Sequence, residues 1–282
     1  MNESSEPELN PMLESLKELL TDPNPCISSL AMKELLDHPD KCEQMLETFQ
    51  DDPDLALRHS LHQLAGCLRL RKLHDKFVFE YEQGTLEPWD AMLIIDQLYD
   101  LRSSKNYLHD MAQDFLTAYD PADGCSLRKI ARHMKARNFS VPPHPILNIY
   151  HFLVGDILEN GQGTAAVLCV LAQLIGNSQQ LPLQIALANG KFCLVDHQRN
   201  LLDPTEDWAI TPKASQDSFH TCSNQEVIRV YLAQLVASSI IVWETFDAHL
   251  FLRLLLQIDN FSRAQLPYPF GKLHAPKPDQ DS

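Results

Sequence analysis

NGQGTAAVLCVLAQLIG, residues 160–176, says more about the architecture of this chain than any other stretch, because it joins a glycine-rich turn to a long apolar run. Thr164 follows the second glycine, where its hydroxyl can cap a helix. The residues after it are apolar all round a helix, which is typical of a buried helix. We therefore expect a helix after Gly163 that forms the buried centre of the fold.

Two segments with the character of β-strands follow this helix. Residues 183–187 alternate Leu and Ile with Gln and Ala, as in a strand that is covered on at least one side. Residues 192–195 are rich in β-forming side chains, and the polar residues 197–200 separate them from Leu201 and Leu202. The pattern predicts a hairpin beside the central helix.

The N-terminal part of the chain contains a repeat of helical character. Met12-Leu13-Glu14-Ser15 recurs as Met45-Leu46-Glu47-Thr48, and the pair Asp22-Pro23 recurs thirty residues later as Asp52-Pro53. Each Asp-Pro pair predicts a helix start, since Asp can cap and Pro fits the first turn. Two helices per unit at this period resemble short HEAT-type repeats.

These patterns divide the chain into five segments. Residues 1–8 are polar and acidic without periodicity, which predicts disorder. Residues 9–84 form the HEAT-like helical region, and residues 85–221 form a core that contains the predicted helix and strands. Residues 222–262 predict a helical hairpin, and the proline-rich residues 263–282 predict an extended tail.

The charge of the chain limits the classes of partner. The 282 residues carry a net charge of -15, from 38 acidic and 23 basic side chains. Nucleic acid is therefore not an expected partner, because phosphates are bound by clustered Lys and Arg. The nearest basic cluster, within residues 128–137, has the spacing of one helix face. We interpret it as a solvated face, with a docking patch for an acidic partner as the alternative.

Cysteine usage and hydropathy predict a cytoplasmic protein without a metal or a membrane segment. The first ten residues lack a signal peptide, and the longest apolar runs are too short to span a bilayer. No CxxC pair occurs, and His59 and His62 have no second cluster with which to hold a metal. Free thiols in a reduced compartment are the simplest interpretation of seven scattered cysteines: Cys26, Cys42, Cys67, Cys125, Cys169, Cys193 and Cys222.

An ordered set of short motifs runs from the middle of the chain towards its C-terminus. Its members are Trp89–Ile95 with Tyr99, Leu108–Ala112, Phe139, Phe152–Leu153 with Asp156–Leu158, Gly163–Leu171, Leu181–Leu183, Gly190–Phe192 and Leu202–Pro204. In order and rough spacing this set resembles the SirB-type branch of the transglutaminase-like superfamily, over about residues 86–258. The resemblance implies an α+β, predominantly helical fold: N-terminal helical repeats packed on a transglutaminase-like core with a small antiparallel sheet, then C-terminal helices.

The chain departs from the parent enzymes of this superfamily at two of three catalytic positions. Those enzymes place Cys at the start of the central helix, His on the next strand and Asp on the one after. The matching positions here hold Ala165, Lys191 and Asp203. Acyl transfer by this route needs a thiolate and a neighbouring imidazole base. Only the orienting acid carries over, so no catalytic residue is expected.

A relocated site is the alternative. Cys169 lies one helical turn after Ala165, and Cys193 and His197 lie on or near the second strand, so either thiol could be drawn together with His197 and Asp203. Burial in an apolar helix would raise the pKa of Cys169 and block substrate, which favours a packed core thiol. Lys191 has three interpretations: a salt bridge with Asp203, one member of an exposed pair of charges with Asp203, or a lysine that forms a Schiff base. Asp203 could be only a turn residue before Pro204.

The favoured hypothesis is a non-catalytic, cytoplasmic scaffold for protein interaction or regulation, without a cofactor. Its partner is expected to be a protein or peptide, because helical repeats offer extended binding faces; the oligomeric state does not follow from the sequence. The family resemblance also suggests a regulatory partner in a bacterial signalling or transcription circuit. The alternative is a cysteine-dependent hydrolase or acyl transferase with a relocated thiol. We expect the old catalytic position to be filled or shallow, without a polar triad.

Overall fold

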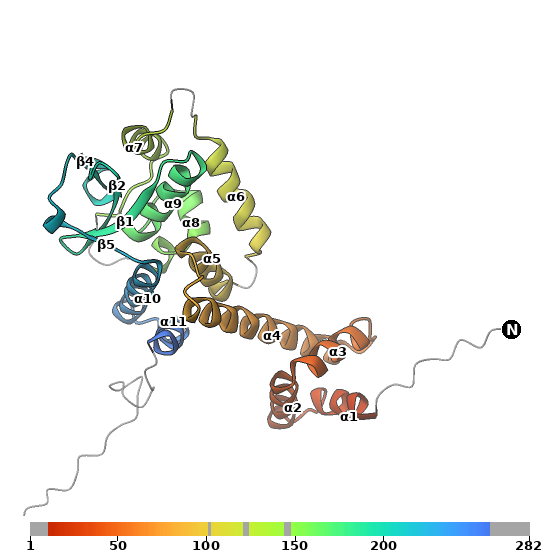
Figure 1. The fold of residues 1–282 in the computed structure, drawn as a ribbon. Coiled ribbons are helices and arrows are strands. Elements are labelled where there is room, and N and C mark those ends of the chain that lie inside the picture. Colours follow the sequence, from red (N-terminus) through yellow and green to blue (C-terminus); the bar gives the residue numbers. More distant parts are fainter. Residues whose placement is uncertain (1–10, 101–102, 121–123, 144–147, 260–282) are drawn as a thin grey trace, which may run out of the picture. The chain divides into compact units, whose positions relative to one another are not determined.

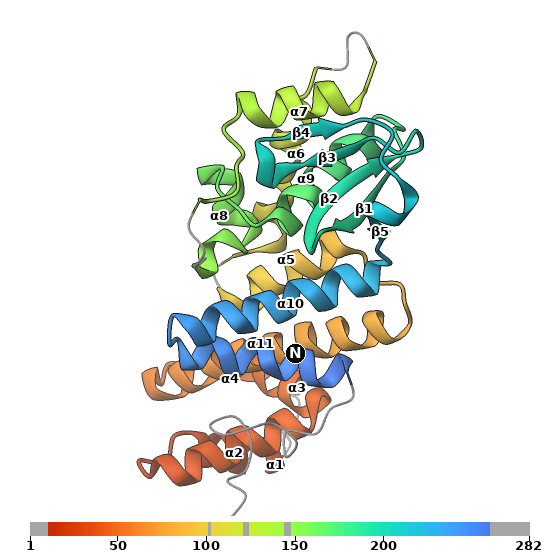
Figure 2. The same cartoon turned by 90° about the vertical axis from the view of Figure 1, so that its left-hand side faces the viewer.

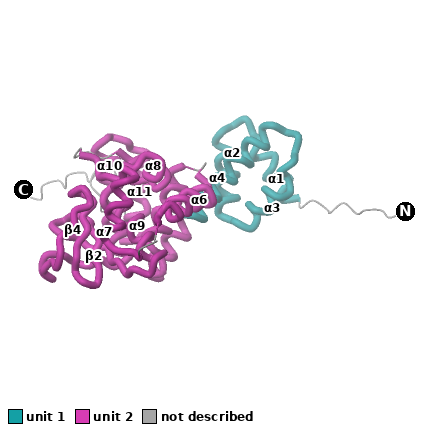
Figure 3. The backbone as a smooth tube through the Cα atoms, turned by 90° about the horizontal axis from the view of Figure 1, so that it is seen from above, with its two compact units in different colours: residues 1–73 teal, residues 74–282 magenta. Residues whose placement is uncertain are grey.

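The computed structural model describes residues 11–100, 103–120, 124–143 and 148–259. Over these residues the chain is α+β and predominantly helical, with one small sheet (Figure 1). It forms two compact units, residues 1–73 and 74–282, and the boundary falls within a long helix (Figure 3). The segments predicted to be disordered (1–8) and extended (263–282) lie outside the described residues.

The first unit is built from short amphipathic helices in sequential contact. Their apolar residues recur at helical spacing and meet in one core, which is the main source of stability for helices of this length. The helices are α1 (Pro11–Leu20), α2 (Pro25–Asp37), α3 (Pro39–Phe49) and the first part of α4 (Leu55–Glu82). The core contains Leu13, Leu16, Leu20, Ala31, Leu35, Cys42, Met45, Phe49, Leu57, Leu61, Leu64 and Leu68.

The repeated Asp-Pro pairs do not start helices directly, which corrects the sequence-based prediction. Asp22 and Asp52 each accept a hydrogen bond from the backbone N–H two residues later, at 2.7 and 2.9 Å. Asn24 and Asp54 then accept the next such bond, at 3.0 and 2.8 Å, and act as the caps of α2 and α4. The two copies share a double Asx turn, so the helices begin later than the prolines indicate.

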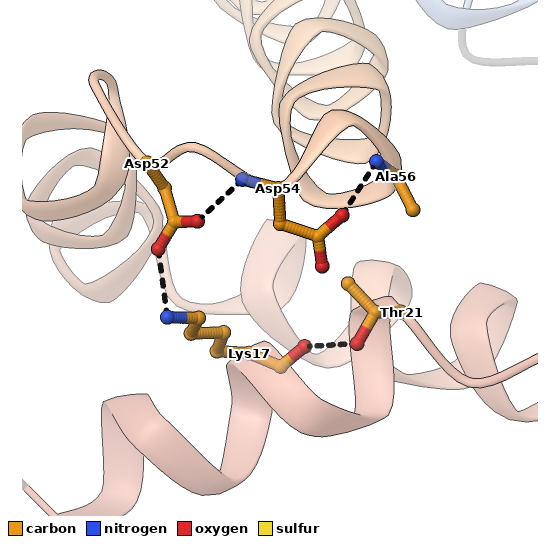
Figure 4. A network of polar contacts seen from close by, with 5 residues as sticks. All are labelled: Lys17, Thr21, Asp52, Asp54 and Ala56. Atoms are coloured by element: carbon orange, nitrogen blue, oxygen red, sulfur yellow. Dashed lines mark hydrogen bonds and ion pairs between the residues drawn. The ribbon is translucent and has the colours of Figure 1, made fainter.

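An ion pair links the two copies of the repeat (Figure 4). Lys17 Nζ donates to Asp52 Oδ2 at 2.7 Å and lies 4.9 Å from the centre of the Phe49 ring. The bond from Lys17, together with the backbone N–H of Asp54, lowers the pKa of the Asp52 carboxyl. The turn before α4 is therefore fixed to α1 by a side chain as well as by the core.

The second unit contains helices on both sides of the glycine-rich turn. Its N-terminal helices after α4 are α5 (Pro88–Tyr99), α6 (Lys105–Thr117), α7 (Leu127–Ala136), the 3-10 turn η1 (Ile149–His151), α8 (Val154–Asn160) and α9 (Ala165–Ser178). After the sheet, α10 (Asn224–Ile241) and α11 (Thr245–Ile258) form a hairpin with extensive mutual contact (Figure 2). None of the described helices is both long and apolar enough to cross a bilayer.

The sheet is small and antiparallel, with the order β4-β3-β2-β1-β5. Its strands are β1 (Leu183–Ala188), β2 (Lys191–Asp196), β3 (Leu201–Asp203), β4 (Ala209–Thr211) and β5 (His220–Thr221), with 3-10 turns η2 (Pro204–Glu206) and η3 (Gln216–Ser218). Asn189 and Gly190 connect β1 to β2 with φ values of 51° and 76°. Both lie in the left-handed region that a tight hairpin turn requires.

Helix α9 lies at the centre of the second unit, as the apolar run predicts. Its residues Ala166–Ala172 are all buried, and it contacts β1, β2, the helices α5, α6 and α7, and the 3-10 turn η2. A side chain at Gly176 would come within 2.8 Å of Leu183, so this glycine lets the helix approach the sheet closely. The other sheet face has its own apolar cluster around Cys193 and Val195.

Candidate functional site

A pocket of about 310 Å³ lies at the N-terminal end of α9. Ala165 and Lys191 both line it, whereas Asp203 does not and is represented only by Thr205, two residues later. The position is therefore not filled, and of the expected filled or shallow site only the shallow form agrees with this half-open pocket, where Gly190 and Ala237 leave space. The lining residues are Val141, Phe152, Thr164, Ala165, Gly190, Lys191, Phe192, Thr205, Gln234, Ala237, Ser238 and Ile241.

The glycine-rich turn fixes the start of α9 at the pocket. Thr164 is the N-cap, as predicted, and its hydroxyl oxygen accepts from Val167 N at 3.5 Å. Its own backbone N–H donates to the His151 carbonyl at 2.7 Å. A side chain at Gly163 would come within 2.8 Å of Ile157, so the turn can pass this close to α8 only as glycine. Ala165 is therefore the first residue of α9 and lines the pocket.

Lys191 pairs with Glu206 rather than with Asp203. Its Nζ donates to Glu206 Oε1 at 3.0 Å, and this bond raises the pKa of the lysine. Both side chains are exposed. The ammonium group therefore stays charged and engaged with η2, which does not favour a Schiff base.

Asp203 is used for local structure. Its Oδ1 accepts from both the backbone N–H and the hydroxyl of Thr205, each at 2.7 Å. This arrangement caps η2, which begins at Pro204. The geometry matches the interpretation of Asp203 as a turn residue.

The two alternative thiols are buried. Cys169 has no exposed surface, and burial raises its pKa well above the usual range. Cys193 donates from Sγ to the Ala186 carbonyl at 3.5 Å, and burial raises its pKa to about 12. Neither thiol lines the pocket. Since the thiolate is the reactive form, neither is prepared for nucleophilic attack at neutral pH.

His197 is not brought to the pocket. It lies beyond the end of β2 opposite to Lys191, a separation of six residues or about 20 Å of extended chain. It is exposed and lines a different pocket, together with Asp196, Arg199 and His220. The relocated set of thiol, imidazole and carboxylate is therefore not assembled.

The pocket wall includes the C-terminal residue of α10, which begins an exposed apolar stretch that the sequence analysis did not single out. Ile241, on the pocket wall, is 60% exposed, and Trp243 after it is 74% exposed. Trp243 has a φ of 66° and ends the turn between α10 and α11. The available signal was the run from Ile240 to Trp243, which is apolar without helical periodicity.

The basic cluster predicted from the sequence lies on α7, whose opposite face is buried through Leu127, Ile130 and Met134. Lys135 Nζ pairs with Asp207 Oδ2 at 2.8 Å, and the Arg137 guanidinium lies 5.8 Å from the centre of the Phe115 ring. These contacts fit the interpretation of a solvated face that packs locally.

No family model matches this chain, and neither the curated proteins nor the solved structures contain a match. The likeness to transglutaminase-like proteins therefore remains a prediction from the motifs. Within the described ranges, no group of three or more His, Cys, Asp and Glu side chains is arranged to hold a metal ion.

Proposed function

We propose that this chain is a non-catalytic binding protein with a degenerate transglutaminase-like core, and that its pocket receives apolar side chains of a protein or peptide. The observation that carries the proposal is the open pocket at the start of α9, with Ala165 in place of a nucleophile. Exposed Ile241 lines the pocket, and exposed Trp243 follows it two residues later in the chain, which adds apolar surface for a partner. Such exposed apolar surface is typical of interaction sites.

The pocket also offers polar groups for orientation. The start of α9 presents backbone N–H groups and the positive end of the helix dipole, which favour a carbonyl or carboxylate oxygen. Thr205, Gln234 and Ser238 line the same space. A peptide could therefore insert an apolar side chain while its backbone carbonyl faces the helix.

We further propose a regulatory role in the bacterial cytoplasm. All seven cysteines are free, which suits a reducing compartment. Because the pocket has no nucleophile, it could bind a polypeptide but not cleave it.

Ala237→Trp is expected to weaken binding of pocket ligands at least tenfold, because the indole would occupy the pocket. Peptides are first selected from a displayed random library on the native chain, and affinities are then measured by fluorescence anisotropy. Ala233→Trp is the matched control, since Ala233 is an exposed alanine on the same helix that does not line the pocket. Equal affinities for the two variants would contradict the proposed pocket.

Thiol labelling separates this proposal from the hydrolase alternative. At pH 7.5, iodoacetamide is expected to modify exposed Cys26 at least 100-fold faster than Cys169 or Cys193, because the buried thiols are shielded and protonated. His197→Ala is expected to leave all three rates unchanged. Rapid modification of Cys169 or Cys193 that this variant slows would instead support a relocated catalytic site. The sites and rates are read by peptide mass spectrometry.

A further inference from the structure

Exposed aromatic side chains from α6, η1 and α11 gather at a pocket that shares no lining residue with the α9 pocket. Phe246, on the first turn of α11, is 82% exposed, and Tyr107 and Tyr150 are each about half exposed. These three rings line a second pocket of about 620 Å³. Large exposed rings gathered at one opening are unusual on a surface that only faces water, and they are common in binding sites.

The second pocket is strongly acidic. Asp96, Asp100, Asp156, Glu159 and Asp247 line it, and none of its described lining residues is Lys or Arg. Arg102 follows this cluster in sequence but lies outside the described residues, and a single cation would still leave an excess of negative charge.

Asp96 and Glu159 are among the carboxylates that already have partners within the fold. Asp96 accepts from the backbone N–H groups of Val154 and Gly155 at 3.0 and 2.8 Å, and Glu159 accepts from the Tyr107 hydroxyl at 2.9 Å. These bonds hold the wall of the pocket, and its negative charge comes mainly from the other carboxylates, because burial raises the pKa of Asp96 to about 7.

Asp156 and Asp247 each lie close to other carboxylates, and the negative charges repel one another. Burial and the neighbouring Glu159 and Asp100 raise the pKa of Asp156, and burial and Glu244 raise the pKa of Asp247. A cation placed among these groups would remove repulsion that is present in the unbound chain. Aromatic rings at the same opening would also attract a cation through their faces.

We propose that this aromatic and acidic surface, around Tyr107, Tyr150, Phe246 and Asp247, docks a basic segment of a partner protein that carries apolar side chains between its Lys or Arg residues. Charge complementarity selects the basic side chains, and the exposed rings select apolar neighbours. The same negative charge disfavours phosphate-bearing surfaces such as nucleic acid and anionic membranes. The inference uses different residues from the α9 pocket and does not rest on the proposed function.

The test uses the full chain and two labelled synthetic peptides of equal length. In one, Lys alternates with Leu; in the other, Lys alternates with Gly. We expect the Lys-Leu peptide to bind at least tenfold more tightly by fluorescence anisotropy, and its affinity to fall with added salt. Equal affinities would mean that only the net charge of the chain attracts peptides, which would overturn the proposal.

Variants then locate the surface. Phe246→Ser and Asp247→Asn are each expected to weaken binding of the Lys-Leu peptide at least fivefold, with far-ultraviolet circular dichroism unchanged. Asp217→Asn, an exposed carboxylate on η3, is the control and is expected to have no effect. An equal loss for Asp217→Asn, or no loss for Phe246→Ser, would place binding elsewhere and overturn the inference.

Two further measurements distinguish other occupants. A chain that ends at residue 259 is expected to bind the Lys-Leu peptide with unchanged affinity. Tenfold tighter binding would mean that residues 260–282 of this chain compete for the surface and that a separate partner is not its occupant. Ala237→Trp is expected to leave this affinity unchanged, so that failure here and failure of the α9 pocket can be told apart.

Discussion

Asp96→Ala is expected to lower the free energy of unfolding by about 4 kcal/mol at pH 5. Asp96 lies on α5, is only 4% exposed, and accepts from the first two backbone N–H groups of α8. No side chain of the residue before α8 caps this helix. The variant would leave two buried donors without a partner, and each such loss costs about 1–3 kcal/mol.

The effect of this substitution is expected to depend on pH. Burial raises the pKa of Asp96 from its ordinary value of 3.8 to about 7. A carboxyl whose folded pKa is raised stabilises the fold most below its unfolded pKa, and this stability is lost as the pH rises towards 7. The loss expected from Asp96→Ala therefore shrinks to about 1–2 kcal/mol at pH 8.

Urea unfolding at pH 5 and pH 8 measures both parts of the prediction. Asp90→Ala is the control, because Asp90 lies on the same helix but is exposed, and we expect it to cost at most about 1 kcal/mol at either pH. A loss below about 1 kcal/mol for Asp96→Ala at pH 5 would show that its bonds to α8 are not important for stability.

Gly161→Ala is expected to cost about 3 kcal/mol, for two separate reasons. Gly161 ends α8 with a φ of 76°, in the left-handed region that favours glycine. A methyl group there would also come within 2.8 Å of the Asn138 carbonyl oxygen. The segment has little room to shift, because the Gly161 carbonyl accepts from Ser140 N at 2.9 Å.

Gly190→Ala separates the two contributions. Gly190 has the same φ of 76°, but a methyl group there would meet no atom within 4 Å. We expect a cost of about 1 kcal/mol, which is the backbone contribution alone. Urea unfolding of both variants measures the difference, and equal losses would show that the approach of Asn138 carries no energetic weight.

Local patterns predicted the centre of the fold well. The apolar run after Thr164 and the polar turn at residues 197–200 predicted a buried helix and the hairpin of β2 and β3, because these signals depend only on neighbours in sequence. The strand β5 was not predicted, since its two residues are too few for alternation and it exists only through pairing with β1. The helix starts after the Asp-Pro pairs were misplaced because a double Asx turn precedes each cap.

The candidate site was predicted only in part, because it depends on contacts between distant segments. The residue types at Ala165, Lys191 and Asp203 were readable from the sequence. The open space beside them depends on Ala237, which α10 supplies from more than seventy positions after Ala165. Lys191 pairs with Glu206, and Thr205 makes two bonds to Asp203 Oδ1; neither set of contacts could be predicted from sequence spacing.

The origin of the α8 cap has a consequence for the order of folding. A helix of seven residues is too short to persist alone in water, and α8 receives its cap from a helix that precedes it by more than fifty positions. α8 can therefore become stable only after α5 has docked beside it. The formation of α8 is therefore a result of the assembly of α5 and α8, and α8 is not the nucleus from which this part of the molecule folds.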